Sequence, residues 1–152
     1  MPRSELEKTV VFGHLAIGGA LHNISGSVYR GSLTPKYFSN FQKTFSGHFH
    51  VHQKLGTTDN KNLVYVGSPM QFNFGDASDT RGIVIYDLDG DSYEHIPNPD
   101  GRLYMVIPEG QLASPSGGIV SSFNGEPIEG KHIRVQFERH VPLEQVHELK
   151  VR

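Results

Sequence analysis

The chain has 152 residues, a formal net charge of −2 and no cysteine. That length fits one domain with its own core, and the lack of cysteine excludes disulfides, thiolate zinc sites and cysteine nucleophiles. The charge gives no overall basic bias toward nucleic acid, and no apolar run approaches the roughly 20 residues that span a bilayer. We therefore expect a cytoplasmic protein with no membrane partner.

The first half of the chain predicts strands separated by a long loop and one short helix. Residues 8–13 form a β-branched run that is typical of a buried strand. Residues 15–33 are rich in glycine and serine, which favours a loop. Thr34-Pro35 predicts the start of a helix that runs through Phe41, with threonine as the N-cap and proline at the first helical position. Two further strands are predicted at 43–48 and 62–67.

The second half predicts more strands. Residues 82–87 are the clearest strand, and Asp89-Gly90 turns the chain back into a second strand at 92–96, so the two form a hairpin. Another strand is expected at 102–107, followed by a Pro- and Gly-rich linker at 108–118. The remaining predictions are a hairpin of 118–123 with 132–137 around Asn124-Gly125, and a helix at 142–150. Strands outnumber helices, which indicates an α+β, strand-rich fold.

Histidines carry the main chemical signal. In Ser46-Gly47-His48-Phe49-His50, the two imidazoles are two residues apart at the end of a predicted strand, so they would face one side. His14 ends another apolar run. Neutral imidazole suits manganese, iron or zinc better than magnesium or calcium. Three imidazoles near strand ends therefore predict a metal site at His14, His48 and His50.

These residues resemble the calcineurin-like metallophosphoesterase superfamily, in the C-terminal part of its catalytic domain. Gly47-His48-Phe49-His50 matches the family's G-H-x-H motif, and His14 matches the lone histidine that precedes it. The Y-x-G-S-P stretch within residues 64–76, followed by Arg81-Gly82, resembles the Mre11/SbcD branch of DNA repair and recombination nucleases, which includes the nuclease subunit of T4-like phages. The resemblance covers about residues 8–100.

The resemblance implies the C-terminal half of a metallophosphoesterase β-sandwich with short flanking helices. Residues 1–107 would be the catalytic-domain portion, 108–118 a linker and 119–152 the start of a capping region. His14 and His48 would bind one manganese ion of a two-metal centre, and His50 the other. The implied activity is that of a DNA exo/endonuclease subunit, and the implied partners are DNA, an SMC/Rad50-like ATPase subunit and a separate N-terminal half.

The chain departs from the family in the motifs that supply carboxylates. It contains no D-x-H and no G-N-H-D, and only Glu5 and Glu7 are acidic before His48. A G-D-x-x-D string occurs at residues 75–79, but it follows G-H-x-H instead of preceding it, so we expect it not to bind the metals. Three neutral ligands cannot balance two divalent cations. We therefore expect an incomplete centre that is inactive alone, as in a truncated product or one half of a split gene.

Two other functions fit parts of the pattern. One is a catalytically silent scaffold that binds DNA or an ATPase, and the other is a general phosphodiesterase or phosphatase of the same superfamily. The G-S-P-M and R-G stretches argue against the second. An isolated half-sandwich would also expose sheet edges, which favours aggregation.

Several further residues have both a functional and a structural interpretation. His52, Ser68 and Arg81 are candidates for a substrate pocket; Arg81, with Asp76 and Asp79, also fits a solvated loop. Ser68-Pro69-Met70 fits equally a tight turn with an apolar plug and a segment that shapes the pocket floor, as in the family branch. Residues 71–74 fit a half-buried strand, with base stacking on Phe72 or Phe74 as the alternative. His22 matches no family position, and four histidines are expected to be solvated: His95, His132, His140 and His147.

Overall fold

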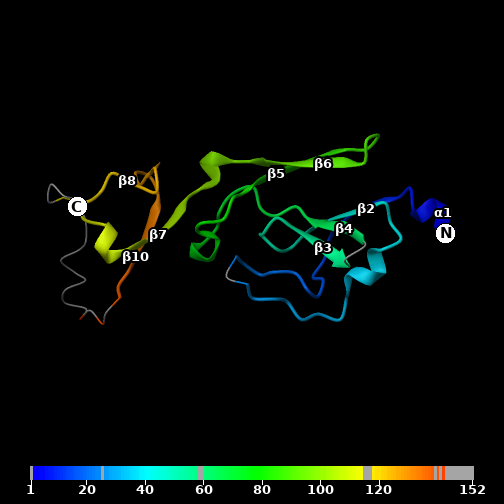
Figure 1. Cartoon of the computed structure of the whole chain (residues 1–152), viewed down its shortest axis with the longest axis horizontal. Helices are drawn as coiled ribbons and strands as arrows, with labels where there is room; N and C mark the ends of the chain where they lie inside the picture. Colours follow the sequence, from blue (N-terminus) through cyan, green and yellow to red (C-terminus); the bar gives the residue numbers. More distant parts are fainter. Residues whose placement is uncertain are drawn as a thin grey trace.

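The computed structural model describes residues 2–24, 26–57, 60–114, 118–138, 140 and 142. A four-stranded sheet in the order β1-β2-β4-β3 lies toward the N-terminal end of the molecule, where Figure 1 labels β2, β3 and β4. β1, β2 and β4 run parallel, and β3 is antiparallel to β4. The strands are β1 (Val10–His14), β2 (Lys43–Gly47), β3 (Gln53–Thr57) and β4 (Asn60–Tyr65). The first two strands and the last were expected from the sequence, with ends that shift by about two residues.

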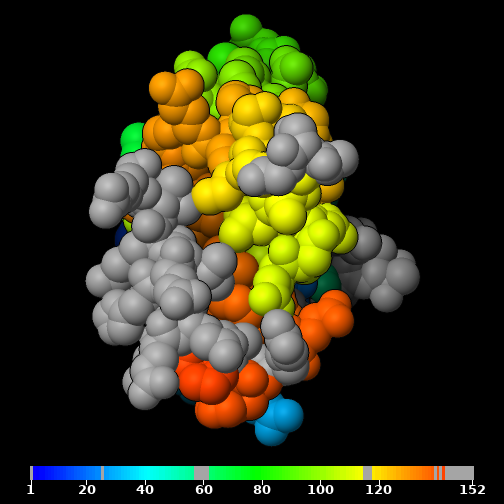
Figure 2. Space-filling view, turned by 90° about the vertical axis from the view of Figure 1, so that its left-hand side faces the viewer, coloured from blue at the N-terminus to red at the C-terminus, as the bar shows by residue number. Residues whose placement is uncertain are grey.

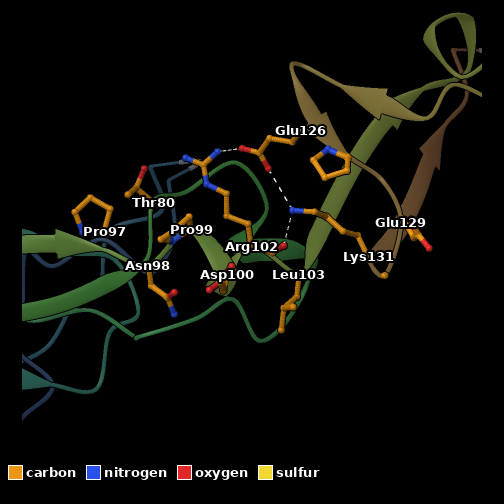
Figure 3. A pocket seen from close by; sticks show the side chains of 12 residues that line it. Thr80, Pro97, Asn98, Pro99, Asp100, Arg102, Leu103, Glu126, Glu129 and Lys131 are labelled. Atoms are coloured by element: carbon orange, nitrogen blue, oxygen red, sulfur yellow. Dashed lines mark hydrogen bonds and ion pairs between the residues drawn. The ribbon is translucent and has the colours of Figure 1, made fainter.

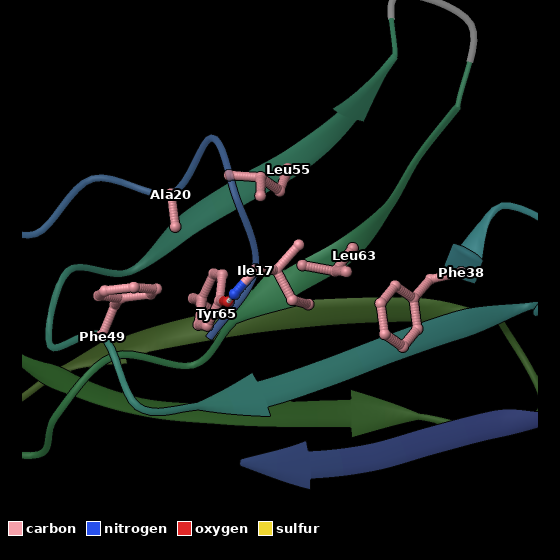
Figure 4. Close-up of a cluster of buried hydrophobic side chains, with 7 residues drawn as sticks. All are labelled: Ile17, Ala20, Phe38, Phe49, Leu55, Leu63 and Tyr65. Carbon is pink, nitrogen blue, oxygen red and sulfur yellow. Dashed lines mark hydrogen bonds between the residues drawn. The ribbon is translucent and has the colours of Figure 1, made fainter. Parts of the chain in front are cut away.

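One face of this sheet packs against the long segment between β1 and β2. A buried cluster joins residues of that segment to β3, β4 and the turn after β2 (Figure 4): Ile17, Ala20, Phe38, Phe49, Leu55, Leu63 and Tyr65. The Tyr65 hydroxyl donates to the carbonyl of Leu15 at 2.8 Å and accepts from the amide of Ile17 at 3.0 Å. A single side chain of β4 therefore holds the chain in place just after β1.

The opposite face is covered by a hairpin of β5 (Gly82–Asp87) and β6 (Ser92–Pro97). The ring of Phe45 on β2 packs against Tyr86 and Tyr93 of the hairpin, with centroids 5.0 and 5.8 Å apart. The hairpin and its turn agree with the sequence. With layers on both faces of the sheet and only short helices, the α+β, strand-rich fold is confirmed.

The sheet is not covered at its first strand. β1 forms an edge of the described sheet, and Phe12, which stacks on Phe45 at 5.6 Å, remains 73% exposed. Ile83 and Ile85, on the outer side of the hairpin, are also more than half exposed. An open edge and exposed apolar side chains favour association with another polypeptide.

The C-terminal strands form a smaller unit at the other end of the molecule (Figure 1). β7 (Tyr104–Pro108) pairs in parallel with β10 (His132–Gln136), and β8 (Ser122–Phe123) pairs with β9 (Glu126–Pro127). Figure 2 shows this end of the molecule, where the described residues of the C-terminal unit are coloured from yellow to orange. The turn at Asn124-Gly125 was predicted correctly, but the pairing was wrong, because residues 132–136 join β7 and not β8.

Several local predictions need correction. The helix expected to run to Phe41 is a 3-10 helix, η1 (Pro35–Phe38), and the Thr34 side chain makes no capping bond. Residues 71–73 form no strand, and the chain continues as the 3-10 helix η2 (Phe74–Asp76). The remaining short helices are α1 (Arg3–Leu6), η3 (Pro99–Gly101) and η4 (Glu109–Gln111), the last inside the predicted linker.

The expected helix at 142–150 lies outside the described residues, apart from its first residue. The division at 108–118 stays a prediction, although β7 of the first segment pairs with β10 of the second. No helix in the part of the chain that the structure describes is long and apolar enough to cross a membrane.

Candidate functional site

The candidate histidines lie at the carboxyl ends of the parallel strands of the four-stranded sheet. Because β1, β2 and β4 are parallel, their carboxyl ends meet at the same edge, which is where ligands bind in open parallel sheets. The register pairs His14 with Gly47, and Ser46 with Tyr65. The chain leaves β1 at His14 and leaves β2 just before His48, so both imidazoles lie at this edge.

His14 and His48 are direct neighbours, with ring centroids 5.4 Å apart in an edge-to-face arrangement. Gly47 permits this approach, because a Cβ atom on it would lie 2.8 Å from Nδ1 of His14. The predicted alternation of His48 and His50 along a strand is wrong. β2 ends at Gly47, and His48 has a φ of 92°, so a sharp bend orients the two side chains.

His48 and His50 nevertheless line one surface hollow. Its other lining residues come from the long first loop and from the chain around η2; the full set is His22, Asn23, His48, Phe49, His50, Asn73, Gly75 and Asp76. His22 and Asp76 are two of the lining residues that the sequence did not predict as site residues. His22 has no signal in the sequence, whereas Asp76 belongs to the G-D-x-x-D string, whose position in the chain argued against a role.

The ring of His50 lies between an aromatic ring and a carboxylate. Its centroid is 5.3 Å from that of Phe72, and its Nδ1 atom lies 3.5 Å from Oδ2 of Asp76. The His50 side chain is 42% exposed, whereas that of Asp76 is 6% exposed. A partly accessible imidazole is thus placed beside a buried carboxylate.

Arg81 is a buried anchor of the site. It is 1% exposed, and its Nη2 atom lies 2.9 Å from Oδ1 of Asp76 and 3.1 Å from Oδ2 of Asp79. Its Nη1 atom donates to the carbonyl of His50 and, at 3.2 Å, to Oγ of Ser68. The interpretation of Asp76, Asp79 and Arg81 as a solvated loop is therefore wrong.

Ser68 is also buried, and its role is structural in this arrangement. Its amide donates to the carbonyl of His50 at 3.1 Å, and its hydroxyl donates to the carbonyl of Met70. Met70 is 39% exposed, so the predicted turn has no apolar plug. Ser68 and Arg81, from the two ends of the connection between β4 and β5, thus both bind the backbone carbonyl of His50.

His52 faces a different part of the molecule. Its Nδ1 atom contacts the carbonyl of Tyr65 at 3.0 Å, and its ring stacks on His95 with centroids 4.3 Å apart and planes 7° apart. His95 was expected to be solvated, but it is half-buried in this contact. The stacked pair links the turn after β2 to β6.

This arrangement predicts a loss of stability in mild acid. Burial lowers the pKa of His52 below its usual 6.5, and the nearby His95 lowers it further. The unfolded chain therefore binds a proton more readily, so stability is fully present above about pH 6.5 and falls as the pH drops below it. The free energy of unfolding is measured in urea at about pH 7.5 and at about pH 5.5. It should decrease less from the higher to the lower pH in His52→Asn than in the parent protein. Parallel losses in both proteins would contradict this prediction.

The donor atoms fit manganese in kind but not in number. Imidazole and carboxylate both bind this ion, but no group of three or more histidine, aspartate or glutamate side chains within the described ranges is close enough to hold a metal. The neighbouring pairs are His14 with His48 and His50 with Asp76. The described residues therefore do not form a complete metal site by themselves.

A larger hollow of about 640 Å³ lies near the C-terminal unit (Figure 3). Glu126 pairs there with Arg102, and its Oε2 atom lies 3.3 Å from Nζ of Lys131. Lys131 also donates to the carbonyl of Arg102 at 2.8 Å. These contacts tie the start of β7 to the β8–β9 hairpin and to the turn before β10, which is a structural role.

Comparison with known proteins shows a distant and partial similarity. No protein-family model matches the chain. Over 66 residues, which are 43% of this chain, it is 32% identical to exonuclease subunit 1 of Enterobacteria phage T4. That match spans 18% of the phage protein. The chain is thus similar, over part of its length, to a small part of a nuclease subunit.

Proposed function

We propose that this chain supplies the C-terminal part of the catalytic centre of a manganese-dependent DNA nuclease, a phosphodiester hydrolase of the metallophosphoesterase type. The observation that carries the proposal is the position of His14, His48 and His50 at the carboxyl edge of one parallel sheet. The partial similarity to a phage exonuclease subunit supports it. In the complete centre His14 and His48 would bind one ion and His50 the other.

The remaining ligands must come from polypeptide outside these residues. The open edge of β1 is suited to receive it, because a strand added in parallel there would end beside His14. Phe12 supplies an apolar contact for such a strand, since it is 73% exposed. Carboxylates at the end of the added strand would balance the metal charge that neutral imidazoles cannot.

In this proposal the completed enzyme works on DNA in a recombination or repair complex, together with an SMC/Rad50-like ATPase. The name of the phage relative, a subunit, supports a multi-subunit assembly. The net charge of −2 means that DNA contacts would depend on the bound cations and on partner surfaces more than on this chain's own charge.

A manganese titration of the chain tests the site directly. Paramagnetic Mn²⁺ broadens NMR signals of nuclei close to it, so the ring signals of His14, His48 and His50 should broaden at lower concentrations than that of His132. His132 serves as the reference because it is exposed and lies on β10, in the C-terminal unit (Figure 1). Broadening of His132 first, or of all histidines together, would overturn the proposed site.

A nuclease assay then tests the activity. With Mn²⁺ and linear double-stranded DNA, we expect no cleavage by this chain alone and cleavage after addition of a polypeptide that carries D-x-H, G-D-x-x-D and G-N-H-D. His50→Ala should abolish the restored activity, and His132→Ala should retain it. Strong activity of the chain alone that is lost in His50→Ala would contradict the need for outside ligands. A mixture that stays inactive would favour the silent DNA- or ATPase-binding scaffold.

A further inference from the structure

We propose that Asp76 is a positioning residue for His50, which holds the imidazole in the tautomer with its proton on Nδ1 and so leaves the lone pair of Nε2 free for a ligand. The contact that suggests this is the 3.5 Å distance between Nδ1 of His50 and Oδ2 of Asp76. The use of Nε2 as a metal ligand rests on the proposed function, but the tautomer itself does not.

The carboxylate of Asp76 is fixed in place. Asp76 is 4% exposed, and its Oδ2 atom accepts from the amide of Phe72 at 2.9 Å. Its Oδ1 atom accepts from Nη2 of Arg81, also at 2.9 Å. Both oxygens therefore have partners that prevent rotation, and Oδ2 keeps its orientation toward His50.

The same group also holds the backbone of His50. Arg81 donates to the carbonyl of His50, and the amide of Ser68 donates to that carbonyl as well. The ring of Phe72 packs on the imidazole at 5.3 Å. Because the backbone and the ring are both fixed relative to Asp76, the contact between Nδ1 and Oδ2 is a built feature of the site.

The charges of the cluster favour a donor at Nδ1. Asp76 and Asp79 both pair with Arg81, so the buried group carries one more negative than positive charge. A buried carboxylate oxygen is stabilised by an N–H group that faces it. Donation from one imidazole nitrogen to a carboxylate determines the tautomer and leaves the other nitrogen as a metal ligand.

Long-range ¹H–¹⁵N correlation of the histidine rings distinguishes the two tautomers. At about pH 8, where imidazoles are mostly neutral, His50 of the parent should be mainly the Nδ1–H form. In Asp76→Asn, the charged guanidinium of Arg81 takes the amide oxygen. The amide NH₂ group then takes the position of Oδ2 and faces the amide of Phe72 as well as Nδ1 of His50. Nδ1 therefore loses its acceptor, and the Nε2–H form should predominate, with a several-fold reversal of the ratio.

The matched control is Asp79→Asn, which removes the same charge beside Arg81 but leaves the Asp76 contact with His50. It should keep the parent tautomer. A parent spectrum with mainly Nε2–H at His50, or an equal shift in both variants, would overturn the inference. The parent spectrum decides the matter even if Asp76→Asn fails to fold. The tautomer is measured without metal. If His50 shows the expected tautomer but the manganese titration fails, the proposed function is rejected and the positioning role of Asp76 stands.

Discussion

Replacing Arg81 with methionine should lower the free energy of unfolding by about 3–5 kcal/mol, the usual cost of removing one partner from a buried ion pair. The guanidinium is 1% exposed and pairs with both Asp76 and Asp79. Methionine fills a similar volume but leaves two buried carboxylates without a cation. Because small domains are stable by only about 5–15 kcal/mol, urea denaturation should show a large decrease in the midpoint.

Two further variants separate charge from geometry. Arg81→Lys keeps the charge but not the planar fork that reaches both aspartates, so its loss should be intermediate. The triple variant Arg81→Met, Asp76→Asn, Asp79→Asn removes the unpaired charges and should recover part of the stability. A loss of less than about 1 kcal/mol in Arg81→Met, typical of a surface pair, would contradict the role of Arg81 as a buried anchor.

Gly82→Ala is the second substitution with a large expected effect. A Cβ atom on Gly82 would collide with the carbonyl oxygen of Ile96, and it would lie 2.9 Å from that carbonyl carbon and from Nε2 of His95. The backbone of the opposite strand cannot yield without breaking the β5–β6 pairing. We expect a loss of about 2–3 kcal/mol from overpacking, measured by urea unfolding.

Gly110→Ala is the matched control. Apart from atoms of its neighbours along the chain, no atom lies within 4 Å of a Cβ built on Gly110, and its backbone is not in the left-handed region. This variant should keep the parent stability or gain a few tenths of a kcal/mol through the unfolded state. If Gly82→Ala and Gly110→Ala behaved alike, the close approach of Ile96 to Gly82 would not be a constraint.

The Arg81-Gly82 pair has a different role in the structure from the one that the sequence suggested. In the sequence, the pair marked a family resemblance, and Arg81 was a candidate for a substrate pocket. In the structure, Arg81 is buried between loops, and Gly82 allows β5 to approach β6. Of these two adjacent residues, Arg81 thus holds the loops of the site together, and Gly82 lets the two strands of the hairpin pack closely.

Local patterns were sufficient for most strands. β5 was located by its apolar run, and its pairing with β6 by the Asp89-Gly90 turn, because hairpin pairing depends on neighbouring residues. The pairing of β10 with β7 was missed, since parallel pairing joins distant segments and leaves no turn signal. The strand expected at 71–74 failed because the buried Asp76 side chain holds the Phe72 amide.

The sequence alone determined the strand-rich class and pointed to His14, His48 and His50, because short motifs and apolar runs are local properties. Only the tertiary structure decided how these histidines are held. His48 is oriented by a backbone bend instead of strand alternation, and His50 faces Asp76, which is 26 positions further along the chain. Arg81 supports that contact by bonding to the backbone of His50 and to Asp76, and a contact between residues so far apart in the chain has no periodic or spacing signal in a single sequence.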